Sequence, residues 1–417
     1  MTTPLEARRS VEAVWRIESA RLIAGLARVT GDVATAEDLA HDALVAALEQ
    51  WPKTGVPDKP GAWLVVVAKR RAIDLARRRT TLQQKHEVLA RNLSDGPETT
   101  ELDRVLLDDD IGDDVLRLIF VACHPVLSTE ARVALTLRLV GGLSTGEVAR
   151  AFLVPEATVA QRIVRAKRTL SEARVPFEVP TGADRLARLA SVLEVIYLIF
   201  NEGYAATSGG EWVRPTLCAE ALRLGRVLAG LLDEPEVHGL VALMEIQASR
   251  LRARVTAAGR PILLADQDRA RWDRLLIRRG LAALARAQDA GRALGPYALQ
   301  AAIAACHARA QRSEDTDWVR IVAVYDALAE VAPSPVVGLN RAVALAMAFG
   351  PAAGLEAVER LADEPTLARY HLLASVRGDL LARLGRSREA RFEFARAASL
   401  TANEAERALL LERAATA

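Results

Sequence analysis

The stretch LVPEATVAQRIVRAKRTL, residues 153–170, has two different faces when it is placed at helical spacing. One face is apolar at the i, i+4, i+7 and i+11 positions, as a buried stripe requires. Its members are Val159, Ile163, Ala166 and Leu170. The opposite face is polar and cationic. Its members are Thr158, Gln161, Arg162, Arg165 and Arg168. We therefore predict a short helix that follows the turn at Pro155 and presents a basic face.

Residues 145–170 have the proportions of a helix-turn-helix, with a support helix at Thr145–Phe152 and a tight turn before the second helix. In that motif the second helix enters the DNA major groove, where Gln and Arg bond to base edges and further cations hold phosphates. The candidate base readers are Thr158, Gln161 and Arg162. The candidate backbone contacts are Arg165, Lys167 and Arg168. The alternative is an amphipathic helix whose basic face is only solvated.

The run GLSTG, residues 142–146, also matches the GxSxG nucleophile elbow of α/β-hydrolases. That fold needs a sheet of several strands, with an acid and a His on later loops. The rest of this chain has helical patterns, and the later histidines lie inside expected helices. We favour Ser144 as the N-cap region of the support helix instead.

The composition favours helices almost throughout the chain. The 417 residues are 51% hydrophobic but only 4% aromatic, and few aromatic or β-branched residues beside abundant Ala and Leu is typical of α-helical proteins. The length predicts two to four domains. The three cysteines form no CxxC pair, which indicates a reducing compartment and argues against a zinc site. With no apolar run of membrane-spanning length, we expect a soluble, cytoplasmic protein without membrane contact.

Residues 10–50 predict two helices that are separated at residues 29–32. Thr35 is the expected N-cap of the second helix, with an acidic residue three positions later. Residues 51–61, WPKTGVPDKPG, predict a loop. A helix then extends to Arg79 and becomes basic in its second half. Its expected apolar stripe comprises Trp63, Val66, Val67 and Ile73.

An acidic segment follows this basic helix, with Arg104 as its single cation. Such a run is typical of a solvated linker. Its acidic members are Asp95, Glu98, Glu101, Asp103, Asp108, Asp109, Asp110, Asp113 and Asp114. A second break, rich in proline, is expected at residues 175–182, and from residue 183 onward the pattern is helix after helix.

The last part of the chain has near-repeat spacing. Small and apolar residues stand where tetratricopeptide helical hairpins place them, because small side chains let two helices approach closely. These positions are Gly378, Leu381, Ala390, Phe394 and Ala397. Gly385 falls in the turn between the helices, residues 339–361 form a weaker copy, and residues 404–414 are the expected capping helix.

Three of these motifs, taken in order, carry a resemblance to a known family. AEDLAHDALVAALEQW (residues 36–51) and GAWLVVVAKRRAIDLARRR (residues 61–79) resemble region 2 of extracytoplasmic-function, or group IV, sigma factors. LSTGEVARAFLVPEATVAQRIVRAKRTL (residues 143–170) resembles their region 4. The fold class that follows is all-α. It comprises a region 2 helical bundle at residues 1–80, an acidic linker at 81–112, a helix-turn-helix region 4 at 113–177 and a tetratricopeptide-like extension at 183–417.

The resemblance implies core RNA polymerase and promoter DNA as partners. The positions that match polymerase-binding ones are Glu37, Asp38, His41, Asp42 and Leu44. The positions that match the phosphate contacts of the −10 element are Lys69, Arg70, Arg71, Arg77 and Arg78. Region 4 would read the −35 element, although Ala160 stands where the family commonly has a cation. The linker would either mimic nucleic-acid phosphates or act as a tether.

The C-terminal half resembles the helical extension of one sigma subgroup, and we expect it to regulate activity through a protein partner or an intramolecular contact. Its densest polar–aromatic clusters lie in the segments FNEGY and QDRARWD. Their members are Asn201, Glu202, Gly203, Tyr204, Asp266, Gln267, Asp268, Arg269 and Trp272. These clusters fit an interface or ligand site, or a buried polar network.

The sequence thus predicts a sigma factor with a fused regulatory domain. We expect no catalytic residue, metal or cofactor, and no enzymatic activity. The alternative is a helix-turn-helix transcription regulator with a ligand- or protein-sensing repeat domain. A third class, a scaffold protein with solubilising basic faces, would show no DNA affinity even at low salt.

Overall fold

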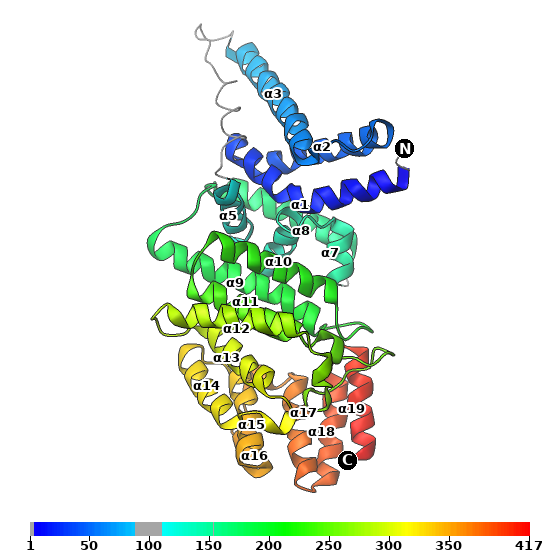
Figure 1. The fold of residues 1–417 in the computed structure, drawn as a ribbon, viewed down its shortest axis with the longest axis vertical. Helices are drawn as coiled ribbons and strands as arrows, with labels where there is room; N and C mark the ends of the chain where they lie inside the picture. Colours follow the sequence, from blue (N-terminus) through cyan, green and yellow to red (C-terminus); the bar gives the residue numbers. More distant parts are fainter. Residues whose placement is uncertain (1–3, 88–110, 153) are drawn as a thin grey trace. The chain divides into compact units, whose positions relative to one another are not determined.

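The computed structural model describes residues 4–87, 111–152 and 154–417, without the side chains of residues 4–8, 76–87 and 111–113. Within these ranges the regular elements are α-helices and short 3-10 helices, which confirms the all-α prediction (Figure 1). The chain divides into two compact units, an N-terminal unit of Met1–Val195 and a C-terminal unit of Ile196–Ala417. Each is described by itself below.

Three long helices begin the N-terminal unit. They are α1 (Pro4–Thr30), α2 (Val33–Thr54) and α3 (Pro60–Glu87), and α1 packs along α2 (Figure 1). The predicted break between the first two is confirmed at Gly31, whose φ is +65°. The N-cap assigned to Thr35 is wrong, because Asp32 caps α2 by accepting a hydrogen bond from Thr35 N at 2.9 Å. An aspartate three residues earlier starts the helix sooner.

The buried stripe of α3 differs from the predicted one. Leu64, Ala68 and Ala72 are buried, whereas Val66 is 48% exposed. The two sets lie on different sides of the helix, and the side that packs on α1 and α2 carries the smaller residues. Trp63 is half-buried and packs edge-to-face on Trp51, with 5.5 Å between ring centroids.

Four shorter helices complete the framework of the N-terminal unit. They are α5 (Ile111–Ala122), α6 (Thr129–Leu139), α7 (Thr145–Phe152) and α8 (Glu156–Glu172). Ser144 caps α7 as predicted, because its Oγ accepts from Glu147 N at 3.2 Å while the Glu147 carboxylate accepts from Ser144 N at 2.8 Å. Helices α7 and α8 pack on each other and α8 packs on α6, which places α8 as the second helix of a helix-turn-helix.

Helix α9 (Gly182–Tyr204) contains the boundary between the two units. The α-helices of the next part are α10 (Pro215–Leu231), α11 (Pro235–Ala248), α12 (Arg274–Asp289) and α13 (Pro296–Arg309). The 3-10 helices of the C-terminal unit are η1 (Leu251–Ala253), η2 (Leu264–Asp266), η3 (Arg269–Arg271), η4 (Ser313–Asp315) and η5 (Pro365–Leu367). Helix α11 lies at the centre of this part, since it packs on α10, α12 and α13.

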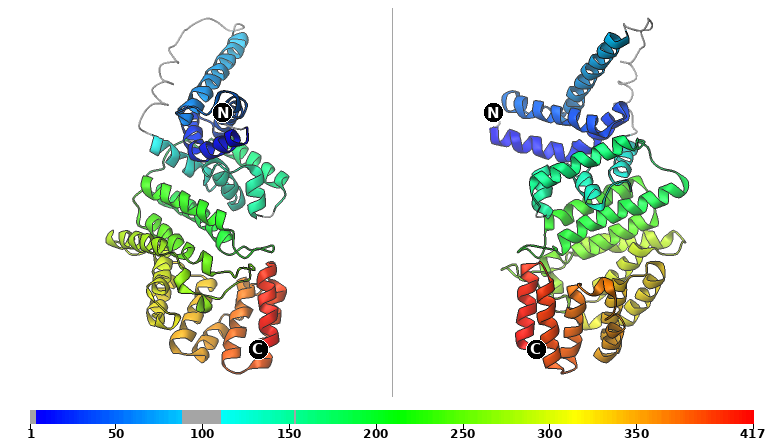
Figure 2. Two further views of the ribbon diagram at one scale, coloured as in Figure 1. Left: turned by 45° about the vertical axis from the view of Figure 1, so that its right-hand side comes forward. Right: turned by 180° about the vertical axis from the view of Figure 1, so that it is seen from behind.

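The remaining helices pack as consecutive neighbours. They are α14 (Trp318–Val331), α15 (Pro335–Phe349), α16 (Pro351–Glu359), α17 (His371–Arg383), α18 (Ser387–Leu400) and α19 (Glu404–Thr416). The last three lie side by side, orange to red in both views of Figure 2. Gly378 of α17 faces Phe394 of α18 so closely that an added Cβ would lie 3.0 Å from the ring. The predicted hairpin contact is present, and the tetratricopeptide assignment stays a prediction.

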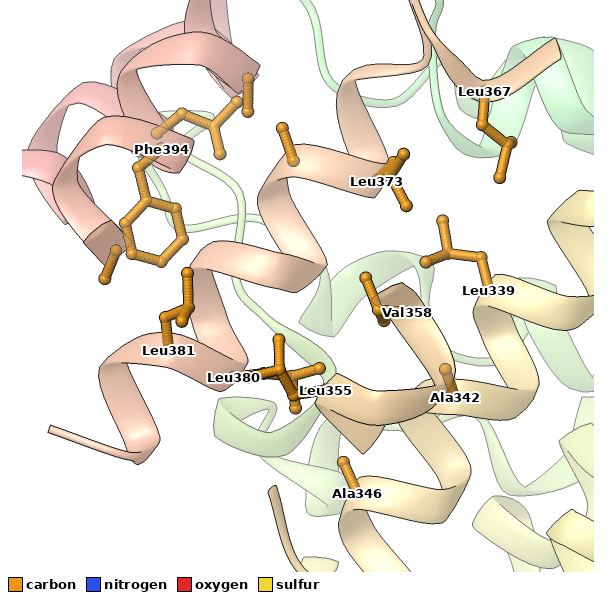
Figure 3. Close-up of a cluster of buried hydrophobic side chains, with 14 of the residues drawn as sticks. Leu339, Ala342, Ala346, Leu355, Val358, Leu367, Leu373, Leu380, Leu381 and Phe394 are labelled. Atoms are coloured by element: carbon orange, nitrogen blue, oxygen red, sulfur yellow. The ribbon is translucent and has the colours of Figure 1, made fainter. Parts of the chain in front are cut away.

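These helices enclose a continuous apolar core (Figure 3). Leu339 of α15, Val358 of α16, Leu373 and Leu381 of α17, and Phe394 of α18 all point into it and are at most 6% exposed. Burial of such side chains contributes about 1.5–3 kcal/mol each. The C-terminal unit therefore has a hydrophobic core of its own.

Candidate nucleic-acid interface

Helix α8 separates its side chains as the sequence predicts. Its buried residues are Val159, Ile163, Ala166 and Leu170. On the other side Gln161, Arg165 and Arg168 are exposed, while Thr158 and Arg162 are half-buried. Arg168 donates from Nε to the Glu172 carboxylate at 2.6 Å on the open surface. The helix thus presents a cationic face that has the form of a DNA-reading surface.

Val164 lies on this same exposed face and is 65% exposed. Sequence reasoning missed it because a valine was not counted among polar candidates. The signal was available, since Val164 stands three residues after Gln161 and therefore shares its side of the helix. An exposed valine among polar groups supplies an apolar contact of the kind that a thymine methyl accepts.

Lys167 points away from this face. Its ammonium forms an ion pair with Glu37 of α2, and the lysine side chain is only 16% exposed. One residue proposed for DNA and one proposed for polymerase therefore meet in the structure. Each was predicted to bind a partner outside the chain, whereas in this conformation Lys167 and Glu37 pair with each other.

Glu37 is the centre of this contact, and it is 4% exposed. Arg138 of α6 donates from Nε to Glu37 Oε1 at 2.7 Å, so the carboxylate faces two cations. Burial opposes ionisation of Glu37, but Lys167 and Arg138 outweigh it and hold the pKa of this carboxyl below its ordinary value. The group is therefore a buried carboxylate that is charged and compensated.

His41 lies beside the same arginine. Arg138 donates from Nη2 to Nε2 of the ring at 2.7 Å, which requires a neutral imidazole as acceptor. Burial first, and then the Arg138 charge, lower the pKa of His41 below its ordinary value. Trp15 of α1 packs edge-to-face on the ring, with 5.6 Å between centroids.

Further contacts join α1 to the helix-turn-helix half of the N-terminal unit. Arg16 donates to Glu147 at 2.5 Å, and Arg28 lies 3.2 Å from the Asp114 carboxylate. Gly142 has a φ of +69°, and an added Cβ would lie 2.8 Å from Ser19 Oγ, so only glycine fits between the two halves. Helices α1 and α2 thus pack on α5, α6 and α8.

The outer face of α2 is open. Asp38 and Asp42 are exposed and Leu44 is half-buried. Val45 and Leu48, which the sequence reasoning missed, are 47% and 39% exposed on the same side. This apolar pair could have been found from the sequence, because residues at i and i+3 lie on the same side of a helix. This face combines acidic and apolar groups, as a protein-docking surface does.

A hollow of about 520 Å³ lies between α2 and α3. Its lining includes Asp38, Asp42 and Asp74, together with Arg71, whose Nη1 lies 2.9 Å from the Asp42 carboxylate. Arg71, expected to hold phosphates, is thus paired with a residue expected to bind polymerase.

Two further basic residues of α3 are described with their side chains. Arg70 is exposed and Lys69 is half-buried. Arg77 and Arg78 lie in α3, but their side chains fall outside the described residues, as do residues 88–110 of the linker predicted at 81–112. Asp114, predicted as a member of the solvated acidic run, is instead 3% exposed in α5.

In the C-terminal unit, the FNEGY segment contains a buried ion pair. Arg214 and Glu202 are 6% and 9% exposed and are ion-paired, and Thr207 Oγ1 donates to the same carboxylate at 2.9 Å. This part of the predicted cluster is a polar network inside the fold. Tyr204 and the QDRARWD residues Arg269 and Trp272 lie elsewhere in the unit, around a different arginine, Arg250.

The described ranges contain no group of His, Cys, Asp and Glu side chains that would hold a metal ion. Cys123, Cys218 and Cys306 are free and buried, and burial raises the pKa of Cys123 to about 12. None of the helices described is both long and apolar enough to cross a membrane.

Comparison with family models gives matches to both halves of the N-terminal unit. Residues 17–81 match sigma-70 region 2, and residues 117–170 match sigma-70 region 4. Residues 188–288 match a family of unknown function, DUF6596. The C-terminal match gives no indication of tetratricopeptide repeats.

One relative matches most of the chain, and two others match a smaller part of it. An uncharacterized protein of Rhizobium meliloti is 47% identical over 90% of this chain and 88% of its own. ECF RNA polymerase sigma factor SigL of Mycobacterium tuberculosis is 31% identical over 34% of this chain and 76% of its own. Probable ECF RNA polymerase sigma factor SigI of the same species is 28% identical over 44% of this chain and 61% of its own. No solved structure matches the chain.

Proposed function

Because the chain belongs to the ECF RNA polymerase sigma factors, we propose that it binds core RNA polymerase and directs it to a set of promoters, where region 2 contacts the −10 element and region 4 the −35 element. The observation that carries the proposal is the exposed cationic face of α8 within a helix-turn-helix. The alternative of a single-motif regulator leaves the region 2 helices without a function.

On α8 we assign base contacts to Thr158, Gln161, Arg162 and Val164, and phosphate contacts to Arg165 and Arg168. Gln and Arg match adenine and guanine edges, and Val matches the thymine methyl. On α3 the proposed −10 contacts are Lys69, Arg70, Arg71, Arg77 and Arg78.

Core polymerase is the proposed partner of the open face of α2. Asp38 and Asp42 supply charge, and Val45 and Leu48 supply exposed apolar area next to Leu44. Apolar groups with charges around them give both affinity and orientation at a protein interface.

We further propose that regions 2 and 4 separate when the protein functions. Lys167 cannot hold a phosphate, and Glu37 and His41 cannot contact polymerase, while these three side chains face one another and Arg138. The described conformation is then a closed form, and polymerase binds the open one. The fraction of open protein would scale the apparent affinity for polymerase.

For the C-terminal unit we propose a regulatory role, exerted through a protein partner or an intramolecular contact. Its own apolar core supports an independent module. The 47% identical relative matches 90% of the chain, which supports a fixed association of this module with the sigma regions.

Run-off transcription with purified core polymerase and a pool of selected promoters tests the central proposal. We expect the full-length protein to start RNA synthesis at a subset of the pool. Replacement of Gln161 and Arg162 by Ala should remove that selectivity and leave polymerase binding intact, because both side chains belong to the reading face.

The matched control is Arg278→Ala, which removes an exposed arginine from α12 and should change neither result. Failure of the folded wild-type protein to initiate at any promoter would overturn the proposal. Loss of polymerase binding in the double variant would refute the role assigned to α8.

A further inference from the structure

Arg250 is a buried cation whose side chain has neither a hydrogen-bond acceptor nor an ion-pair partner among the described residues. It follows α11, it is 8% exposed, and its Nε is fully buried without a hydrogen-bond acceptor. Its guanidinium carbon lies 5.7 Å from the ring centroid of Tyr204 and 5.7 Å from that of Trp272. Among the residues that the structure describes, no side chain or carbonyl accepts a hydrogen bond from this guanidinium, and none forms an ion pair with it.

Arg254 lies on the Tyr204 side of Arg250. Its guanidinium carbon is 3.7 Å from the Tyr204 centroid and 5.6 Å from that of Trp212. Nη2 donates to the Tyr204 carbonyl at 3.1 Å. Burial lowers the pKa of Arg254, and the nearby Arg250 charge lowers it further. A carbonyl and two rings therefore surround this cation, and none of them is charged.

Arg269 lies on the Trp272 side, with its guanidinium carbon 4.8 Å from the Trp272 centroid. It is also 8% exposed. Nη1 donates to the carbonyl of Ala310 at 2.9 Å, and Nη2 donates to Thr316 Oγ1 at 3.3 Å. These acceptors are neutral as well.

The carboxylates near this group of arginines are occupied elsewhere. Burial lowers the pKa of Arg269 and the charges of Asp315 and Glu314 oppose this, but both acidic side chains are exposed and pair with Arg312. Glu202 pairs with Arg214. Glu245 pairs with Arg226 through Oε1, and its Oε2 is buried without a hydrogen-bond partner. The same unit thus neutralises its other buried arginine, Arg214, and leaves Arg250, Arg254 and Arg269 without a carboxylate.

His307 adds no negative charge to the group. It is buried beside Trp318, and burial together with the charges of Arg250 and Arg269 lowers its pKa to about 3. Its ring is neutral at physiological pH. The site is therefore a cluster of cations in an apolar and aromatic setting, where an uncompensated charge is costly.

We propose that Arg250, Arg254 and Arg269 bind the oxyanion of a small molecule, a phosphate or a carboxylate. The guanidinium fork matches both groups and forms paired hydrogen bonds with them. The rings of Tyr204, Trp212 and Trp272 hold the guanidinium planes and limit water around them. The arginines supply more positive charge than one carboxylate balances, which favours phosphate as the first probe.

A hollow of the same unit shares Trp212 with the cluster, while Arg250, Arg254 and Arg269 do not line it. It has a volume of about 330 Å³ and is lined by Trp212, which also faces Arg254, and by Val255, Arg260 and Leu409. That volume is at the lower end of what small-molecule sites occupy. The site does not depend on promoter or polymerase binding, so its failure and that of the sigma function are separable.

The test is a titration of the full-length protein with inorganic phosphate, followed by isothermal calorimetry and by thermal unfolding at constant ionic strength set with chloride. Sodium acetate in a parallel arm distinguishes a carboxylate from a phosphate. We expect saturable binding of phosphate and a rise in Tm. Acetate binding without phosphate binding would keep the oxyanion site and assign it to a carboxylate.

Arg250→Met should abolish the response, whereas Arg252→Met should retain it, because Arg252 lies two residues later, in η1, but is exposed. Arg250→Lys, which keeps the charge but not the fork, should weaken binding at least tenfold and covers the case in which the methionine variant does not fold. The proposal is overturned if neither anion binds more than chloride does, or if Arg250→Met or Arg250→Lys binds as the wild type does.

Discussion

Two buried charges in this chain are treated in opposite ways. Glu37 in the N-terminal unit is 4% exposed and faces Arg138 and Lys167. Arg250 in the C-terminal unit is 8% exposed and faces two rings and two further arginines. The first charge has partners supplied by the protein. The second lacks any such partner.

The difference indicates what each site is for. A buried ion pair between separate helical segments fixes their arrangement, and removing one member leaves the others uncompensated. A buried charge without a counterion holds its place only if a ligand, or the stability of the rest of the fold, offsets the cost. The pair around Glu37 is therefore a closing contact, and the cluster around Arg250 is an incomplete site.

The largest expected effect is a difference in the free energy of unfolding between two variants, Glu37→Leu and Arg250→Met. The first should lower the free energy of unfolding of the N-terminal unit by about 3 kcal/mol, because Arg138 and Lys167 lose their counterion. The second should leave the unfolding free energy of the C-terminal unit unchanged or higher in phosphate-free buffer, because it removes an unpaired charge.

Denaturant unfolding followed by hydrogen exchange in each unit measures both values. Asp38→Asn is the control, since Asp38 is exposed beside Glu37 and its replacement should cost less than about 0.5 kcal/mol. Equal losses at Glu37 and Arg250 would remove the distinction between the two sites.

A second expected effect is on polymerase affinity. Arg138→Met opens the closing contact from the region 4 side and leaves Glu37 and His41 in place for polymerase. We expect core polymerase to bind this variant about tenfold more tightly, which corresponds to a loss of about 1.4 kcal/mol from the closed form. An anisotropy titration of labelled protein with core polymerase gives the ratio.

Arg132→Met is the matched control for this variant. Arg132 lies in the same helix, is similarly buried and pairs with Glu194 at 3.0 Å instead of with region 2. Identical affinities for Arg138→Met and the wild type would show that closure does not compete with polymerase.

The helix-turn-helix was predictable from sequence because its information is local. The stripe of Val159, Ile163, Ala166 and Leu170 follows from one helical period, and Ser144 from the capping pattern with Glu147. The stripe of α3 was predicted wrongly at Val66, since an apolar run such as LVVVA fits several sides of a helix and only packing on α1 and α2 selects one.

Neither buried charge was predictable. Glu37 and Lys167 are 130 residues apart in the sequence, and each has a plausible external partner when its own motif is considered alone. Arg250 lies outside both the FNEGY and the QDRARWD segments, which supply the rings and the arginine that surround it. The local signal in the sequence was an arginine two residues after the end of the apolar helix α11.

Acid should weaken the closing contact but not the arginine cluster. The pKa of Glu37 in the closed form lies below its ordinary value of 4.5, so its contribution is present above that value and is lost as pH falls through the lowered one. The pKa of His41 is also lowered, from 6.5, so its contribution begins to fall below pH 6.5. Guanidinium groups stay charged throughout this range.

The groups that face His41 are Arg138, Glu37, Lys167 and Asp38, and a protonated ring would meet the two cations. Polymerase affinity should therefore rise relative to Arg138→Met as the pH falls from 7 to 5.5, and the ratio of the two affinities cancels any titration of polymerase itself. A ratio that does not change with pH would exclude His41 from the closing contact.

The smallest expected effect is on DNA affinity and concerns an ion pair that is exposed to solvent. Arg168 and Glu172 pair on the open face of α8, with side chains that are 77% and 62% exposed. Solvent screens such a pair, so its loss hardly changes stability. Glu172→Gln should instead free Arg168 for phosphate and tighten binding of holoenzyme to a selected promoter by less than about threefold, with a steeper salt dependence. Glu156→Gln, at the other end of α8, removes the same charge without releasing an arginine. If both variants tighten binding equally, net charge alone is responsible, and the exposed pair has no bearing on how Arg168 meets DNA.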